Sequence, residues 1–276
     1  MKVVHIPPGM PEAKCTMSTH VPDNLNAPLT QLLLSIADDK LLLGTRNSDW
    51  TGLGPILEED IAFSHLAQDE MAHAQALYEF IAEMTGQRAD DIALGRKPEE
   101  YRCATIVEVP DEFDWATAIC RQFFCDHFDA IRLARLSNSN VKPLADLSRR
   151  IAAEEAVHVQ HSDSWVQRLG AAGGEARARM QKALDALAPQ AAMLWEPFQG
   201  EDVLAPAGAY PRRQGSDFAA WSTALAAITR GAGLTLNLQP PVPSMRGGRR
   251  GVHSEHLQPL LDEMCEVYRT DPGAAW

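Results

Sequence analysis

The stretches Glu70-Met-Ala-His73 and Glu155-Ala-Val-His158 decide the fold of this chain, because each is a Glu-x-x-His motif inside a long segment with helical periodicity. A helix places residues three positions apart on one face, so each motif directs a carboxylate and an imidazole to the same side. Two such helices facing each other bring two glutamates and two histidines to the centre of a bundle. The repeated motif therefore favours a helical bundle whose polar core offers metal ligands.

A further acidic residue precedes each motif on a separate predicted helix. Asp126 lies about 29 residues before the second motif, and Asp39 and Lys40 lie at a similar interval before the first. The chain thus reads as two similar halves, each with a mid-helix acid followed by a helix carrying Glu-x-x-His. Two carboxylates and one histidine per half are the ligands of a two-metal site, and such ligands suit iron or manganese better than zinc.

Two points stay open from the residues alone. Glu70 and His73 either face the core or face solvent, since a carboxylate on an apolar face is costly unless it is paired or metal-bound. On the first helix, the inward residue is either Asp39 or Lys40. A protonated lysine offers no metal bond and would instead form a salt bridge with the remaining carboxylates, replacing the charge of a cation with its own. The candidate metal ligands are Asp39, Glu70, His73, Asp126, Glu155 and His158.

The remaining pattern predicts an all-α, ferritin-like four-helix bundle with additional C-terminal helices, because no sustained period-2 runs occur. An irregular N-terminal arm, 1–28, precedes a single helical domain, 29–276. A long crossover at 86–111, with a short helix at 88–94, is typical of ferritin-like bundles. The predicted helices cover 29–46, 56–84, 112–136, 143–169 and 175–195, with shorter ones at 217–229 and 256–268.

Composition narrows the functional class. The net charge is −12, from 25 basic and 37 acidic residues, which argues against nucleic acid as a partner. Five cysteines without a CxxC pair indicate neither a disulfide framework nor a zinc ribbon. The N-terminus has no apolar stretch of signal-peptide length, and no apolar run approaches the length of a membrane span. We therefore expect a cytoplasmic protein that does not enter a membrane.

The arrangement of these motifs resembles the phenylacetyl-CoA epoxidase family. The resemblance rests on Trp50, the stretch Gln68-Asp-Glu-Met-Ala-His73, Asp126 and the stretch Glu154-Glu-Ala-Val-His158. That family has a ferritin-like fold and two homologous large subunits, one catalytic with a di-iron site and one structural that has lost most ligands. The stretches 118–126 and 247–264 are similar to the structural subunit, whereas the Glu-x-x-His pairs are those of the catalytic one.

The resemblance also implies a ligand set. Glu70, His73, Asp126, Glu155 and His158 match the family's metal ligands, so five of six are present. Aligned on Trp50, the first-helix position falls at Lys40, with Asp39 adjacent. Three states remain open for such a site: an active di-iron centre, a half-occupied centre, or a former metal site in which a lysine salt bridge replaces the metal. No catalytic residue outside the metal site is predicted.

By the same resemblance, the chain is expected to be a subunit of a multicomponent ring-1,2-epoxidase acting on phenylacetyl-CoA. A carboxylate-bridged di-iron site, or manganese in its place, would activate O2 as in a monooxygenase. The implied partners are a homologous ferritin-like subunit or a second copy, a reductase component and an acyl-CoA substrate. The alternatives are a metal-free scaffold subunit of that complex and a stand-alone ferritin-like di-metal oxidase. Arg246, Arg249 and Arg250 either contact coenzyme A phosphates or an acidic partner, or lie in a solvated loop.

Overall fold

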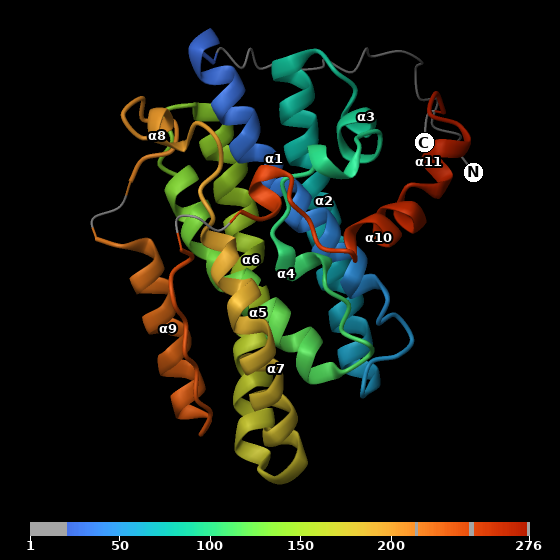
Figure 1. Ribbon diagram of the computed structural model, residues 1–276, viewed down its shortest axis with the longest axis vertical. Helices are drawn as coiled ribbons and strands as arrows, with labels where there is room; N and C mark the ends of the chain where they lie inside the picture. Colours follow the sequence, from blue (N-terminus) through green and yellow to red (C-terminus); the bar gives the residue numbers. More distant parts are fainter. Residues whose placement is uncertain (1–20, 213–214, 243–245, 275–276) are drawn as a thin grey trace, which may run out of the picture.

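The fold is all-α and is built on four long helices (Figure 1). The computed structural model describes residues 21–212, 215–242 and 246–274, and no strand occurs within these ranges. Helix α1 packs along α2, and α5 packs along α6. These contacts confirm the predicted ferritin-like bundle. The four helices are α1 Asp23–Ser48, α2 Leu57–Thr85, α5 Trp115–Leu136 and α6 Lys142–Ala172.

Further helices cover the bundle after α6. Helix α7 (Gly174–Ala192) packs on both α5 and α6, and α9 (Asp217–Gly231) contacts the same pair (Figure 1). The C-terminal helices α10 and α11, red in Figure 1, lie on the side of α3. The shorter elements are α3 Ala89–Leu94, η1 Pro98–Glu100, α4 Thr105–Glu108, η2 Met193–Trp195, α8 Glu201–Leu204, η3 Gly248–Arg250, α10 Leu257–Met264 and α11 Glu266–Thr270.

Several boundaries differ from the sequence prediction. Helix α1 begins at Asp23, so the last residues of the predicted arm are helical even though Pro28 lies within them. Val21 and Leu25 are buried, and this tertiary burial outweighs the helix-breaking tendency of the proline. The rest of the arm, 1–20, lies outside the described residues. The predicted helix at 175–195 ends in a 3-10 turn, and the one at 256–268 divides at Cys265 into α10 and α11.

The bundle core has two apolar clusters that meet a polar layer between them. The first cluster includes Phe63 and Phe123, and the second includes Leu33 and Tyr78. Each of the four long helices contributes to both clusters, and each carries buried charged residues at the point where it passes from one to the other. The candidate ligands predicted from the sequence belong to this middle layer. The fold therefore positions the site at mid-height of the bundle.

A close contact between α1 and α2 fixes the position of α1, the first helix that contributes to the site. A Cβ atom added at Gly44 would lie 3.0 Å from the carbonyl oxygen of Ala67 and 3.1 Å from Cβ of Glu70. Glycine thus lets the two helices approach closely, because a side chain there would require its neighbours to shift by a few tenths of an ångström. Lys40 lies one turn before Gly44, so the same contact brings Lys40 next to the first Glu-x-x-His motif.

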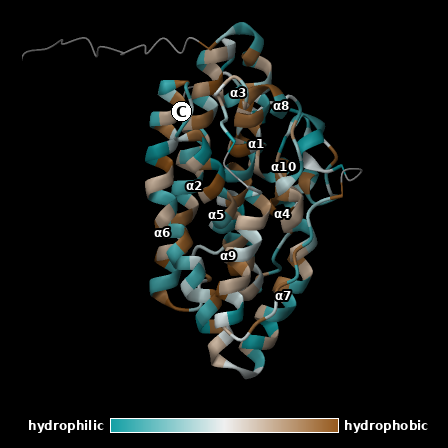
Figure 2. Cartoon of the chain, turned by 90° about the vertical axis from the view of Figure 1, so that its left-hand side faces the viewer, coloured by the Kyte–Doolittle hydropathy of each residue, from teal (hydrophilic) through white to brown (hydrophobic). Residues whose placement is uncertain are grey.

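The outer surface of the bundle is polar along its exposed helix faces, as the teal residues on α6 show in Figure 2. Buried residues on α6 recur every three or four positions, which leaves the opposite face for charged side chains. Among the described residues, none of the helices combines the length and apolar character that a membrane crossing requires.

Candidate functional site

The two Glu-x-x-His motifs point into the core. Glu70 and His73 on α2 are buried, and so are Glu155 and His158 on α6. On α6 both residues belong to its single buried stripe, which also explains why Glu155 faces inward while its neighbour Glu154 is half-exposed. The alternative in which Glu70 and His73 face solvent does not hold in the structure. All five residues matched to family ligands, including Asp126 on α5, lie in the buried middle layer.

Lys40 lies at the centre of this layer. Its Nζ atom is 2.7 Å from Oε2 of Glu70, 2.7 Å from Oε1 of Glu155 and 2.7 Å from Oδ2 of Asp129. The Lys40 side chain has no exposed area, and the three carboxylates are almost fully buried. An ammonium group has three protons, so each proton can face one carboxylate oxygen. The lysine therefore bridges α1 to α2, α5 and α6.

Asp129 is a site residue that sequence reasoning missed. It lies one turn after Asp126 on α5, so the spacing of the two acids was a usable signal. Its second oxygen is 2.5 Å from Nε of Arg132 on the same helix. Arg132 continues the network, because its Nη1 lies 2.8 Å from Oδ2 of Asp39. The buried charges thus form a continuous chain from Lys40 to Asp39.

Asp39 itself turns away from the two motifs. Its carboxylate accepts hydrogen bonds from Arg249 at 2.6 Å and from the backbone nitrogen of Ala104 at 2.8 Å, besides the contact with Arg132. The structure therefore does not bring Asp39 together with the other candidate ligands. Asp38 also points elsewhere, toward the hydroxyl of Tyr78. The inward residue of helix α1 is Lys40.

Each histidine joins an inward glutamate to an acid at the surface. His73 lies 3.1 Å from Glu155 through Nδ1 and 2.6 Å from Glu154 through Nε2. His158 lies 3.5 Å from Oε1 of Glu70 through Nδ1 and 3.2 Å from Oδ2 of Asp69 through Nε2. Both rings are therefore held by carboxylates on both nitrogens, and both tie α2 to α6.

Asp126 occupies a different environment. It accepts hydrogen bonds from the amide of Gln122 at 2.5 Å and from the hydroxyl of Ser162 at 2.8 Å, and it has no lysine or arginine partner among the described residues. Burial raises the pKa of Asp126 well above its usual range, although His158 opposes this shift. The environment of Asp126 thus opposes its ionisation, whereas the pKa values of Glu70 and Glu155 beside Lys40 are lowered.

The charges of the layer stabilise one another. Burial alone would lower the pKa of Lys40, but Asp129, Glu155 and Glu70 raise it well above its usual range. Burial would raise the pKa of Glu155, yet the charge of Lys40 and the hydrogen bond with His73 lower it to about 2. For His158, burial opposes protonation, but the bond to Glu70 and the charge of Glu155 raise its pKa to about 10. Lys40 therefore remains an ammonium ion at neutral pH.

The donor set does not fit a pair of iron ions while Lys40 is in place. The ammonium lies between Glu70 and Glu155, two of the candidate metal ligands, and a metal ion there would meet a like charge at close range. Helix α1 contributes no carboxylate to the site, because Asp39 pairs with arginines. One oxygen or nitrogen from each of Glu70, Asp126, Glu155 and His158 lies within 4.8 Å of the others, a spacing that a single ion could use.

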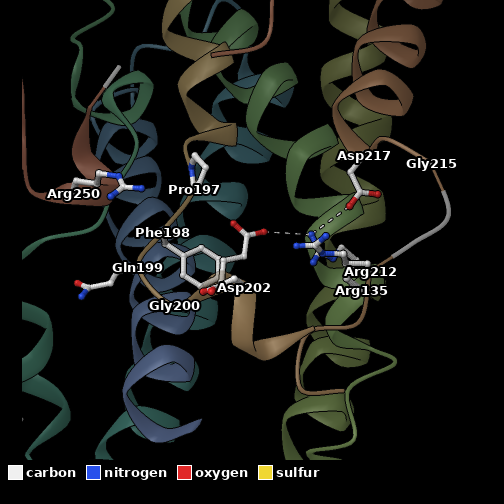
Figure 3. A pocket seen from close by; sticks show the side chains of 11 residues that line it. Arg135, Pro197, Phe198, Gln199, Gly200, Asp202, Arg212, Gly215, Asp217 and Arg250 are labelled. Carbon is white, nitrogen blue, oxygen red and sulfur yellow. Dashed lines mark hydrogen bonds and ion pairs between the residues drawn. The ribbon is translucent and has the colours of Figure 1, made fainter. Parts of the chain in front are cut away.

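The three arginines predicted to contact coenzyme A or a partner lie in different surroundings. Arg249 is buried in its ion pair with Asp39, so it is not available to an external ligand. Arg246 is exposed, and Arg250 is exposed with its Nε 3.8 Å from Glu196. Arg250 also lines a surface pocket together with Arg135 and Arg212 (Figure 3). Acidic residues line the same pocket. A dashed line in Figure 3 joins Arg135 to Asp217, and Nη1 of Arg135 also lies 4.0 Å from Oε1 of Glu201.

Comparison with known proteins identifies relatives over almost the whole chain. Residues 11–276 match the family described as phenylacetic acid catabolic protein. The chain is also 31% identical over 251 residues to one of the subunits of the 1,2-phenylacetyl-CoA epoxidase of Escherichia coli (strain K12). That match covers 90% of this chain and 99% of the relative. The chain therefore belongs to the phenylacetic acid catabolic protein family.

Proposed function

We propose that this chain is a non-catalytic subunit of a phenylacetyl-CoA epoxidase complex, in which Lys40 takes the place of the metal ions. Membership of the complex is supported by the similarity to the Escherichia coli epoxidase subunit over nearly its full length. The observation that carries the non-catalytic role is the contact of Lys40 Nζ with Glu70, Glu155 and Asp129, each at 2.7 Å. A buried ammonium supplies the positive charge that these carboxylates would otherwise take from a metal.

The charge balance of the buried layer supports this proposal. The three carboxylates around Lys40 would be strongly destabilising if they were left unpaired. In the structure each of these carboxylates lies against a cationic side chain, so the layer pairs its charges without a metal. The cations are Lys40, Arg132, His158 and Arg249, and the carboxylates are Asp39, Glu70, Asp129 and Glu155.

In this proposal the oxygen chemistry belongs to a homologous ferritin-like subunit, which pairs with this chain and carries the iron. The acyl-CoA substrate and the reductase component then act on the complex, and this chain supports the fold and position of its partner. The exposed Arg246 and Arg250 are the members of the arginine cluster that remain available to a coenzyme A phosphate or to an acidic partner.

The alternative function is that of a metal-binding oxygenase subunit, with iron or manganese at the same layer. The observation in its favour is the convergence of Glu70, Asp126, Glu155 and His158 within 4.8 Å. It would require Lys40 to leave its three partners or to lose its proton, and the raised pKa of Lys40 opposes the second route. Metal would then supply O2 activation, and the chain's carboxylates and imidazole would hold it.

Metal analysis separates the two functions. The full chain is produced in iron-supplemented and manganese-supplemented medium and purified alone and together with the catalytic subunit of a phenylacetyl-CoA epoxidase. We expect no stoichiometric iron or manganese in this chain and a stable complex between the two subunits. About two irons per chain, lost in a Glu70→Ala, Glu155→Ala variant, would support the oxygenase instead. Failure to associate with the catalytic subunit would contradict membership of the complex.

A variant without the ammonium and its two glutamate partners tests the role in catalysis directly. Lys40→Met, Glu70→Gln and Glu155→Gln together remove the ammonium and two of its carboxylates while keeping side-chain sizes similar. Asp129 keeps Arg132 as its partner. If this chain is non-catalytic, the complex with the triple variant should retain epoxidation of phenylacetyl-CoA. Loss of activity in a complex that still assembles would show that these residues take part in the reaction.

A further inference from the structure

A second cluster of potential metal ligands lies outside the Lys40 layer. Cys103 precedes α4, Glu108 ends α4, and His253 follows η3 in the C-terminal segment. The Sγ atom of Cys103 is 3.6 Å from Oε1 of Glu108 and 3.7 Å from Nδ1 of His253, and these last two atoms are 2.8 Å apart. Cys103 and Glu108 are fully buried, and the side chain of His253 is 7% exposed.

We propose that Cys103, Glu108 and His253 are the three protein ligands of a site for a zinc-type divalent cation. Tetrahedral zinc binds sulfur at about 2.3 Å and nitrogen or oxygen at about 2.0–2.1 Å, which places the sulfur about 3.5–3.6 Å from each of the other two ligands. The observed sulfur distances of 3.6 and 3.7 Å agree with this geometry. Only the gap between Nδ1 and Oε1 must open, from 2.8 Å to about 3.3 Å.

The surrounding groups orient two of these ligands, His253 and Glu108, as they do at known metal sites. The other ring nitrogen of His253, Nε2, lies 3.2 Å from the carbonyl oxygen of Tyr101, which leaves Nδ1 to face the cluster. The second oxygen of Glu108 accepts hydrogen bonds from the backbone nitrogen and the hydroxyl of Ser254, each at 2.7 Å. Oε1 is therefore the carboxylate oxygen directed at Cys103 and His253.

The charge of the cluster permits an exchange of a cation for protons. Without metal, burial raises the pKa of the Cys103 thiol well above its usual range, so the thiol keeps its proton. Another proton must lie between Nδ1 of His253 and the Glu108 carboxylate, because both atoms are otherwise acceptors. A divalent ion that displaces these two protons leaves a thiolate, a carboxylate and a neutral imidazole. The net charge of the site is then zero in both states, so the ion brings no uncompensated charge into the core.

The backbone brings the two segments close enough for this site. A Cβ atom at Gly248 would lie 1.8 Å from the carbonyl oxygen of Cys103, and one at Gly251 would lie 2.3 Å from that of Glu99. Glycines are therefore required where the C-terminal segment crosses the segment before α4. A bound ion would connect the α4 segment, through Cys103 and Glu108, to the C-terminal segment, through His253. These bonds would fix the C-terminal part of the chain to the bundle.

Cobalt(II) is the probe for this site, because a thiolate ligand gives a sulfur-to-cobalt charge-transfer absorption that carboxylates and imidazoles do not give. The full chain is stripped of metal, kept reduced and titrated with cobalt(II), then with zinc. We expect the band to saturate at one ion per chain, to disappear when zinc replaces cobalt, and to accompany release of about two protons per ion. Absence of a saturable thiolate band would overturn the proposal.

Cys120→Ala is the matched control for Cys103→Ala, since both thiols are fully buried in the same apolar cluster. The Cys103 variant should lose the band, and the Cys120 variant should keep it. A band that survives in folded Cys103→Ala would place the cobalt elsewhere and contradict the assignment. His253→Gln gives a second test if the cysteine variant does not fold, because weaker cobalt binding is expected there while Cys103 is intact. The Lys40 layer does not interfere, because its convergent ligand group contains no cysteine.

Discussion

Replacement of Lys40 by methionine tests whether the buried ammonium holds the bundle together. Methionine keeps most of the length of the side chain but removes the charge that faces Glu70, Glu155 and Asp129. Asp129 keeps Arg132, and the two glutamates keep only histidine and glutamine contacts. Removal of one partner from a buried ion pair costs about 3–5 kcal/mol, so we expect the free energy of unfolding at pH 7 to fall by that amount.

The measurement is equilibrium denaturation in urea, followed by far-ultraviolet circular dichroism, with a chelator present so that no metal fills the space. Lys142→Met is the matched control, because the Lys142 side chain is 73% exposed and its one salt bridge to a described residue is with Asp146. The stability of this control variant should not change measurably. Lys40→Met combined with Glu155→Gln should recover part of the loss, since it removes one unpaired carboxylate. A decrease of less than about 1 kcal/mol in the free energy of unfolding of Lys40→Met would refute the reasoning, because buried unpaired carboxylates destabilise a fold by more than that.

The dependence of stability on pH gives a further check on the Lys40→Met variant. In the native protein the pKa of Glu155 is lowered to about 2, so its stabilising contribution is present above the ordinary value of 4.5 and is lost as the pH falls toward 2. Without Lys40, the main charge that lowers this pKa is gone. The stability difference between native protein and Lys40→Met should therefore narrow as the pH falls from about 4.5, and a constant difference would show that the cost is steric.

Three other predictions concern the same layer and the helix contact beside it. Lys40→Glu adds a carboxylate where the ammonium was, so it should make stability depend on added iron or manganese, seen as a rise in melting temperature that native protein lacks. The pKa of His158 is raised to about 10, so its stabilising contribution is complete below a pH of about 6.5 and disappears as the pH rises through 10. In urea denaturation at alkaline pH, His158→Gln should therefore lose stability less steeply than the native protein. Gly44→Ala places a Cβ 3.0 Å from the carbonyl oxygen of Ala67 and should cost about 1–3 kcal/mol in urea denaturation, whereas Gly231→Ala, with no atom within 4 Å of its Cβ, should cost nothing.

Most of the helical framework could be predicted from the sequence, because helical periodicity is a local property of the chain. The buried stripe on α6 recurs every three or four residues, and this spacing already directs Glu155 and His158 to one face. The sequence prediction begins the first helix at 29, after an arm with several prolines, whereas burial of Leu25 in the core extends α1 back to Asp23. The short helices α4 and α8 depend on contacts with distant segments and left no periodic signal.

The sequence by itself determined which helices carry the acids and histidines and which faces they share. It left open whether Asp39 or Lys40 faces the motifs, because adjacent residues on a helix point about 100° apart and either choice gives an acceptable stripe. Only the tertiary structure decided this point. The contact at Gly44 fixes the rotation of α1 against α2, and Arg132 and Arg249 hold Asp39 on the other side. The position of Lys40 among carboxylates from three other helices exists only after those helices have packed together.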